Sequence, residues 1–210
     1  EIEDMPGIFR QSVDVLTDAI SKDINMGLKS HMLFYVMDEE LKDSTATMAS
    51  KSDSPLNEAI RELRKEHGSN IVIFSDVCLC TGTDHGHCGV LEGERIANDK
   101  TVEELVRIAL SNAEAGVDYI ALSDMMDGRV SEVRGALEEG GYHETGILSY
   151  SVKYASSFYG PFRGAASSSP EFGDRKSHQM DVRSGYGEAI LEALQDEKEG
   201  ADIIMIKPGL

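Results

Sequence analysis

Residues 101–124 read TVEELVRIALSNAEAGVDYIALSD and join an amphipathic helix to a short apolar strand. In the first part, apolar residues recur every three or four positions, which is the spacing of one helix face. Thr101 and Glu104 predict a capping box at the start of this helix, and Gly116 predicts its end. The run at 118–122 lacks the alternation of a half-exposed strand, so we expect a strand that is buried on both faces.

The same helix and strand pattern recurs along the chain. Apolar runs lie at residues 32–36, 70–74, 118–122, 146–150 and 202–206. Other helical patterns lie at 54–68 and around Ile190, Leu191 and Leu194, before Gly200. Continuous apolar strands that alternate with helices form a parallel sheet, so we predict the α/β fold class. No linker, low-complexity segment or repeat divides the chain, and we expect residues 1–210 to form a single domain.

The three cysteines of the chain, Cys78, Cys80 and Cys88, lie within eleven residues. Their spacing is typical of a metal clip in which a strand end supplies two thiolates and a loop supplies the third. Three sulfur ligands without a fourth cysteine indicate zinc with an open coordination position, as in a reacting site. His85 or His87 could close that position. The alternatives to a metal site are buried thiols, or one disulfide and a free cysteine.

Polar residues follow four of the five apolar runs. Asp76 and the cysteines come after the second run, Ser123 after the third, Lys153 after the fourth and Lys207 after the fifth. The carboxyl ends of parallel strands meet on one rim, which is where sites are built in α/β sheets and barrels. We therefore expect these four segments to converge.

Lys153 and Lys207 are the candidates for covalent chemistry. Each lies at a predicted strand end, and Lys153 has aromatic neighbours in the sequence. Desolvation and repulsion from a second lysine lower the pKa of an amine, and a neutral amine condenses with a ketone to a Schiff base. Either lysine by itself could equally extend to water, but two lysines on one rim favour chemistry.

Residues 158–179 are rich in glycine and aromatic residues and too long for a simple connection, so we predict a lid. Arg163 and Arg175 within this segment could clamp a carboxylate through paired hydrogen bonds. The alternative for these arginines is surface ion pairing, because the protein is strongly acidic.

The formal net charge of the chain is −18 at pH 7. This charge argues against a nucleic-acid partner, because a phosphate backbone requires a basic surface. The sequence shows neither a signal peptide nor an apolar span of about twenty residues. We therefore expect a cytoplasmic protein without a membrane partner, and a reducing compartment suits cysteines that act as thiolates.

Several motifs together resemble porphobilinogen synthase, also called 5-aminolevulinate dehydratase. They occur in the family's order as MPGIFR (5–10), DVCLC (76–80), HGHCG (85–89), SDMMDGR (123–129), SYSVKYAS (149–156), FYGPFR (158–163), GDR (173–175) and IKPG (206–209). The resemblance covers essentially the whole chain. It implies a (β/α)8 TIM barrel and a lyase that condenses two molecules of 5-aminolevulinate to porphobilinogen, an early step of tetrapyrrole and haem biosynthesis.

The resemblance also implies residue roles. Lys207 would form the essential Schiff base, and Lys153 would bind the other substrate molecule as an imine. Zinc would be held by the three cysteines, as in the zinc-dependent branch of the family. The other substrate-binding residues would be Arg163, Arg175 and Gln179 for a carboxylate, with Asp76, Ser123 and Tyr159 lining the pocket. Glu192 matches a carboxylate that in some members helps to bind an allosteric magnesium ion.

Family members extend beyond these motifs. They carry an N-terminal arm and a first strand before the motif at 5–10, and two more strands after Lys207. Those last strands supply a serine and a tyrosine for the second substrate's carboxylate. The resemblance therefore implies about five of eight barrel strands in this chain, and we expect the polypeptide alone to be inactive. In the family, the arm organises a homo-octamer.

Two other functions remain open. A class I aldolase-type barrel would share the Schiff-base chemistry but gives no reason for the cysteine cluster. A non-catalytic, truncated homologue would use its zinc for structure, and such a protein should unfold when the metal is lost.

Overall fold

The computed structural model describes residues 1–170 and 172–209. Within these residues, five parallel strands form one curled sheet in the order β1-β2-β5-β6-β7. They are β1 (Ser30–Leu33), β2 (Val72–Val77), β5 (Tyr119–Leu122), β6 (Gly146–Lys153) and β7 (Ile203–Lys207). A separate antiparallel pair consists of β3 (Leu91–Glu92) and β4 (Arg95–Ile96). The strand order follows the chain, as in part of an α/β barrel, so the predicted α/β class is confirmed.

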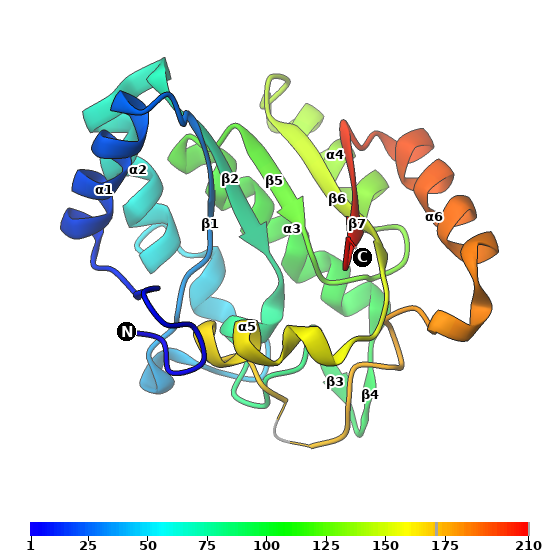
Figure 1. Cartoon of the computed structure of the whole chain (residues 1–210). Coiled ribbons are helices and arrows are strands. Elements are labelled where there is room, and N and C mark those ends of the chain that lie inside the picture. The colour runs from blue at the N-terminus through cyan, green and yellow to red at the C-terminus, as the bar shows by residue number, and fades with distance from the viewer. Residues whose placement is uncertain (171, 210) are drawn as a thin grey trace.

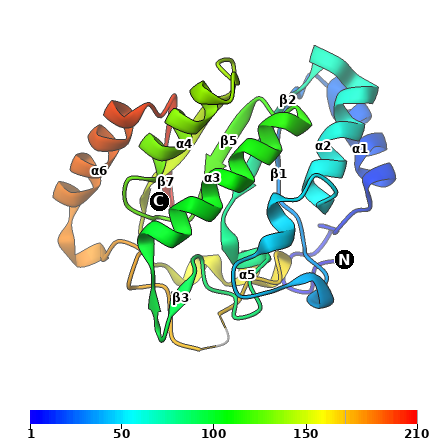
Figure 2. The same cartoon turned by 180° about the vertical axis from the view of Figure 1, so that it is seen from behind.

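Helices cover the outer face of this sheet (Figures 1 and 2). They are α1 (Val13–Asn25), α2 (Pro55–His67), α3 (Asn98–Ala115), α4 (Arg129–Glu139) and α6 (Tyr186–Glu199). The short helix α5 (Gly160–Ala165) differs, because it crosses the carboxyl ends of the strands (Figure 1). None of the helices in the described ranges is long and apolar enough to cross a lipid bilayer.

Apolar side chains pack on both faces of the sheet. The outer layer packs the strands against the helices, and Leu63, Leu105 and Ile120 within it are fully buried. The inner layer, on the concave face, includes Ala121 and Tyr150. Neighbouring residues of a strand point to opposite faces, so Ile120 and Ala121 belong to different layers. Burial on both faces explains the continuous apolar runs of β2, β5 and β6, whereas the edge strands β1 and β7 are only partly buried, against the prediction.

Leu63→Ala should lower the free energy of unfolding by about 2–5 kcal/mol, because it removes a fully buried side chain and leaves a cavity. Chemical denaturation measures this change. Glu66→Ala, at an exposed position of the same helix, is the matched control and should change stability by less than about 0.5 kcal/mol. Equal losses in the two variants would contradict the packing of α2 described here.

All five predicted strands are present in the predicted order, but several ends differ. The second strand starts at Val72 rather than residue 70, because residues 68–70 form a 3-10 turn after α2. The fourth continues three residues further than predicted, to Lys153. The first ends at Leu33, and Phe34 instead lines the cavity at the carboxyl ends of the strands.

The helix signals were only partly right. Helix α2 begins as predicted, and the Ser54 hydroxyl accepts a hydrogen bond from the Asn57 N–H. The predicted capping box at Thr101 is wrong, because α3 already begins at Asn98. The Thr101 side chain is buried inside the helix, where its hydroxyl donates to the Ala97 carbonyl at 2.7 Å.

Helix α6 forms as predicted, but its large apolar residues do not pack on the sheet. Ile190, Leu191 and Leu194 are 58, 71 and 56% exposed. The side of α6 that faces the sheet carries Asp196, which is buried and accepts a hydrogen bond from the Ser149 hydroxyl of β6 at 2.6 Å. The periodicity therefore identified this helix without identifying the face that packs.

Candidate active site

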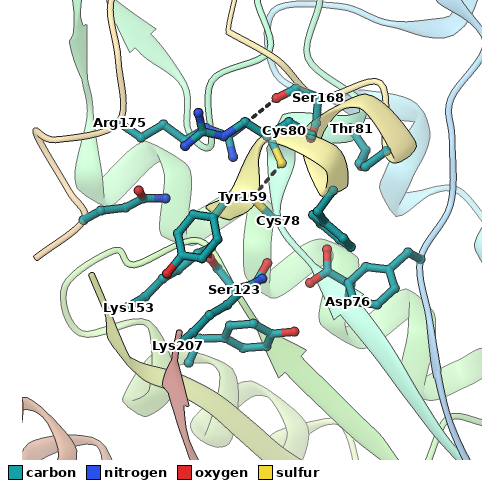
Figure 3. Close-up of a pocket in the computed structure, with 16 residues that line it drawn as sticks. Asp76, Cys78, Cys80, Thr81, Ser123, Lys153, Tyr159, Ser168, Arg175 and Lys207 are labelled. Carbon is teal, nitrogen blue, oxygen red and sulfur yellow. Dashed lines mark hydrogen bonds between the residues drawn. The ribbon is translucent and has the colours of Figure 1, made fainter. Parts of the chain in front are cut away.

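The predicted site residues converge at the carboxyl ends of the strands. A small cavity there has a volume of about 30 Å³, and Figure 3 shows the side chains around it. Its lining includes these predicted residues: Asp76, Cys78, Cys80, Ser123, Lys153, Tyr159, Arg163, Arg175, Gln179 and Lys207. Cys88 is outside this lining but packs with the other two cysteines. Glu192 lies apart from the cavity, with its carboxylate 3.9 Å from the Arg129 guanidinium.

Lys153 and Lys207 stand side by side on neighbouring strands. They are register partners in the parallel pair β6 and β7, so both side chains leave the sheet on the same side. A register shift in β6 between Ser149 and Val152 produces this match. With regular pairing from Ser149 onward, Val152 would stand opposite Lys207. Both amine nitrogens lie 5.5 Å from the centre of the Tyr150 ring.

The Lys207 amine sits among aromatic rings. Its Nζ lies 5.5 Å from the ring centre of Tyr150, 5.0 Å from that of Tyr159 and 4.8 Å from that of Phe162. Ring faces attract an ammonium ion, but these rings also displace water. Burial, followed by the charge of Lys153, lowers the pKa of Lys207 below its ordinary value. The net effect favours a neutral, nucleophilic amine.

Lys153 is held by the backbone that follows β5. Its Nζ donates to the Ser123 carbonyl at 2.5 Å, and the residue is only 6% exposed. The next residue, Asp124, is fully buried and lies 3.6 Å from the Arg129 guanidinium, which is also buried. These contacts fix the Ser123 carbonyl, which accepts the hydrogen bond from Lys153 Nζ. Lys153 therefore has a defined position beside Lys207.

Several buried polar atoms of the cavity wall have no hydrogen-bond partner within the described part of the chain. They are Asp76 Oδ1, Thr81 Oγ1, Arg163 Nε, Arg175 Nε and both polar atoms of the Gln179 amide. An unpaired buried polar group costs about 1–3 kcal/mol, so a polar ligand or water would complete this wall. Burial, followed by the charge of Cys80, raises the pKa of Asp76 to about 7. This carboxyl can therefore hold or release a proton near neutral pH.

The three cysteines form a compact, buried cluster. The Cys78 and Cys80 sulfurs are 3.3 Å apart, and all three sulfurs lie within 4.8 Å of one another. All three are free thiols, which corrects the disulfide alternative. Thiolates on a tetrahedral zinc ion with bonds of about 2.3 Å would be about 3.8 Å apart. The cluster therefore has the donor type and spacing that such an ion requires.

Cys88 is the member of the cluster that ionises most readily. Hydrogen bonds from the Cys78 and Cys80 thiols, followed by the positive charges of Arg175 and Lys153, lower the pKa of Cys88 well below its ordinary value. The same thiol contacts raise the pKa of Cys78. An ionised thiol in a buried trio is the form that binds a metal cation.

The candidate histidines do not join this cluster. Across the described ranges, the cysteines form the one group of three or more close histidine, cysteine or carboxylate ligands. His85 Nδ1 instead accepts a hydrogen bond from the His87 backbone N–H at 3.1 Å, and the His87 ring packs 4.7 Å from the Phe172 ring. A metal bound by the sulfurs alone would keep a coordination position open, and Cys78 and Cys80 line the cavity.

The segment predicted as a lid, residues 158–179, supplies one wall of the cavity; Glu171 within it lies outside the described residues. The loop that carries the cysteines (residues 78–88, the cysteine loop) packs closely against this segment at Gly86. A Cβ atom there would lie 2.3 Å from the Ser169 carbonyl oxygen, and φ is +69°, so glycine is required. Arg175 joins the two segments by donating to the carbonyls of Gly86 and Ser168.

Sequence reasoning did not single out some residues of the wall. These are Phe34, Thr81, Phe162, Ala166 and Ser168. Thr81 directly follows a predicted cysteine ligand, so the strand-end pattern could have indicated it, whereas Phe34 lies in the middle of the apolar run predicted at 32–36. The others belong to the predicted lid, and their positions depend on how that segment folds.

The comparison with known proteins agrees with this geometry. A family model described as "Delta-aminolevulinic acid dehydratase" matches residues 1–210. The chain belongs to the delta-aminolevulinic acid dehydratase family. Among curated members of this family, the chain is 49% identical over 209 residues to the protein of Methanothermobacter thermautotrophicus, covering 100% of this chain and 63% of that one. It is 46% identical over 210 residues to the Helicobacter pylori dehydratase, covering 100% of this chain and 64% of that one.

A solved dehydratase has the same fold. The crystal structure of the Toxoplasma gondii enzyme, also named porphobilinogen synthase, was determined in complex with its reaction product porphobilinogen. It superposes with a TM-score of 0.96 at 43% identity, and the match covers 100% of this chain and 60% of that one. The predicted incomplete-barrel architecture is thereby confirmed. The chain spans less than two thirds of the length of these dehydratases.

Proposed function

We propose that this chain carries the Schiff-base and metal site of a porphobilinogen synthase, a lyase that condenses two molecules of 5-aminolevulinate to porphobilinogen. The observation that carries the proposal is the pairing of Lys153 and Lys207 on β6 and β7 at a cavity shared with the cysteine cluster. Membership of the dehydratase family supports it. The class I aldolase alternative gives no reason for three buried sulfurs in the same wall.

The lysines would perform the covalent steps. The neutral Lys207 amine attacks the ketone carbon of one 5-aminolevulinate, and loss of water leaves an imine. Lys153 condenses with the second molecule in the same way. The imine nitrogen accepts electron density when the adjacent carbon loses a proton. Asp76, whose pKa is about 7, is the nearby carboxyl that can receive and return protons.

A substrate carboxylate would be held on the lid side of the cavity. Arg163 and Arg175 both line this side, and Gln179 presents an amide that has no partner among the residues described. Two guanidinium groups and an amide donor match the acceptor oxygens of a carboxylate. Ser123 and Tyr159 also line the cavity. Their proposed role, contact with the substrate, follows from the family resemblance.

The cysteine cluster would hold zinc, since it offers three sulfur donors at suitable spacing. Zinc held there would supply Lewis-acid chemistry towards a substrate oxygen. Glu192 remains a predicted magnesium ligand. Magnesium commonly uses one or two carboxylates and several waters, so its site does not require a cluster like that of the cysteines.

The wider assembly is also proposed from the resemblance. Residues 1–210 would act as a single barrel-type domain of a cytoplasmic homo-octamer. Five strands do not close an eight-stranded barrel, so we expect turnover to require the further strands that family members possess. Imine formation needs only the lysines and one substrate, and it can therefore be tested with this chain.

Borohydride reduction in the presence of 5-aminolevulinate tests the proposed function. Reduction fixes an imine as a stable amine, so the intact mass should increase by one or two reduced substrate units. Pyruvate is the comparison, because an aldolase-type site for another keto acid would not prefer 5-aminolevulinate. Absence of an adduct, or equal trapping of both keto acids, would contradict the proposed substrate.

Trapping at Lys207 should persist to lower pH than trapping at an ordinary lysine. The lowered pKa of Lys207 leaves more neutral amine near neutral pH, and the charge of Lys153 contributes to that lowering. Lys153→Met should therefore move the pH midpoint of Lys207 trapping upward. The yield of the Lys207 adduct against pH measures the shift. Lys176→Met, at an exposed lysine of the lid, is the control, and a downward shift in Lys153→Met would contradict the assigned charge effect.

A further inference from the structure

Arg10, the last residue of the motif at 5–10, contacts the lid far along the chain. Its Nε donates to the Ala165 carbonyl at 2.9 Å, and its Nη2 donates to the Gly164 carbonyl at 2.7 Å and the Ser167 hydroxyl at 3.0 Å. The last carbonyls of a helix have no partner within the helix. A guanidinium at the end of α5 satisfies them and complements the negative end of the helix.

A second cation binds the backbone of Ser167, two residues after the end of α5. Lys42 Nζ donates to the Ser167 carbonyl at 3.2 Å and to the Glu39 carboxylate at 2.6 Å, and its side chain is only 6% exposed. Ser167 has a φ of +48°, which is uncommon for a residue other than glycine. The C-terminal end of α5 is therefore held from two directions by the N-terminal part of the chain.

These contacts determine the position of the residues above the Lys207 amine. Helix α5 carries Phe162 and Arg163, which both line the cavity. The Phe162 ring lies 4.8 Å from Lys207 Nζ and 4.9 Å from the Phe34 ring. Because Arg10 binds the backbone directly after Arg163, any movement of α5 away from the strands must change the contacts of Arg10.

The cavity beneath α5 is too small for a substrate. Its volume of about 30 Å³ accommodates only a few water molecules, whereas a five-carbon amino acid needs several times that space. Residues of the strand ends and of the cysteine loop form other walls of the cavity, and α5 crosses the carboxyl ends of the strands (Figure 1). Because Phe162 and Arg163 of α5 line this cavity, movement of α5 away from the strands would widen it.

We propose that Arg10 is a positioning residue that latches α5 over the Lys207 amine, and that release of this latch opens the cavity. The latched state buries Lys207 beneath Phe162 and keeps Arg163 at the cavity wall. The contact itself is independent of the proposed function. The effect of the latch on entry of 5-aminolevulinate rests on the proposed function.

Amide hydrogen exchange of α5 in the absence of substrate tests the latch. Arg10→Ala should accelerate exchange in residues 160–168 by on the order of ten- to a hundredfold, because three hydrogen bonds are lost. Arg10→Lys should restore part of the protection. Arg107→Ala is the matched control, since Arg107 is an exposed arginine whose ion pairs are with Glu103 and Glu104 of its own helix. Unchanged exchange in Arg10→Ala would overturn the latch, and so would equal acceleration in the core strands.

Borohydride trapping then connects the latch to the site. In Arg10→Ala, adducts with 5-aminolevulinate should form several-fold faster, and the pH midpoint at Lys207 should move upward because Phe162 no longer buries the amine. A variant that traps at the wild-type rate and midpoint would overturn the link between Arg10 and Lys207. If exchange in α5 accelerates but neither protein forms an adduct, the latch stands and the proposed function fails.

Discussion

Lys207→Met should reduce borohydride trapping of 5-aminolevulinate at this site by on the order of a thousandfold or more, because the variant lacks the attacking amine. Methionine has a similar length and can fill the space between the rings of Tyr150, Tyr159 and Phe162, so the fold should be retained. Peptide mass spectrometry after reduction gives the adduct yield at residue 207 separately from the yield at Lys153. The thermal unfolding midpoint should change little.

Two comparisons make this result specific. Lys153→Met should still form the adduct at Lys207, since the two amines bind different substrate molecules in the proposed reaction. Lys176→Met replaces an exposed lysine of the lid and should trap as the wild type does. If Lys207→Met trapped 5-aminolevulinate at the wild-type level, the nucleophile would be another residue and the proposed mechanism would be wrong.

Cys88→Ala should weaken zinc binding by at least about a hundredfold, because it removes one of three sulfur ligands and the thiol that ionises most readily. Competition with a chromophoric chelator measures the affinity. Alanine also removes the Cys88 contacts and charge that raise the pKa of Cys78 and Cys80, so these two thiols should become easier to ionise, and the loss of affinity comes from the missing ligand. A catalytic metal site predicts that the variant stays folded with a similar unfolding midpoint.

His87→Ala is the matched control for this experiment. The His87 ring packs on Phe172 and is outside the cysteine group, so its loss should leave zinc affinity within a few-fold of the wild type. If His87→Ala lost as much affinity as Cys88→Ala, the metal site would be closed by a histidine. If removal of zinc unfolded the protein, the metal would be structural, as in the non-catalytic alternative.

The sequence indicated much of this arrangement because its main signals are local. Apolar runs identified all five strands, and parallel strands bring their carboxyl ends to the same rim whatever the details of packing. Asp76, Ser123, Lys153 and Lys207 could therefore be placed around one cavity before their contacts were known. The cysteine spacing was equally informative, since two sulfurs at a strand end and one in the next loop can meet without long-range information.

Other features depend on packing that periodicity does not report. Strand β6 is buried almost throughout, so no alternation reveals the register shift that aligns Lys153 with Lys207. Helix α5 begins with Gly160 and Pro161, residues that disfavour a helix interior, although proline is suited to a first turn. The contact between Arg10 and this helix joins distant segments, and the motif alone did not predict it.

The position of the reduced substrate adduct tests the proposed chemistry most directly. After borohydride reduction with 5-aminolevulinate, the protein is digested and the modified lysines are identified by peptide mass spectrometry. We predict modification at Lys207, accompanied by Lys153 when both sites are filled. An adduct confined to exposed lysines such as Lys65, with residues 203–209 unmodified, would contradict the assignment of the paired lysines as the reacting groups.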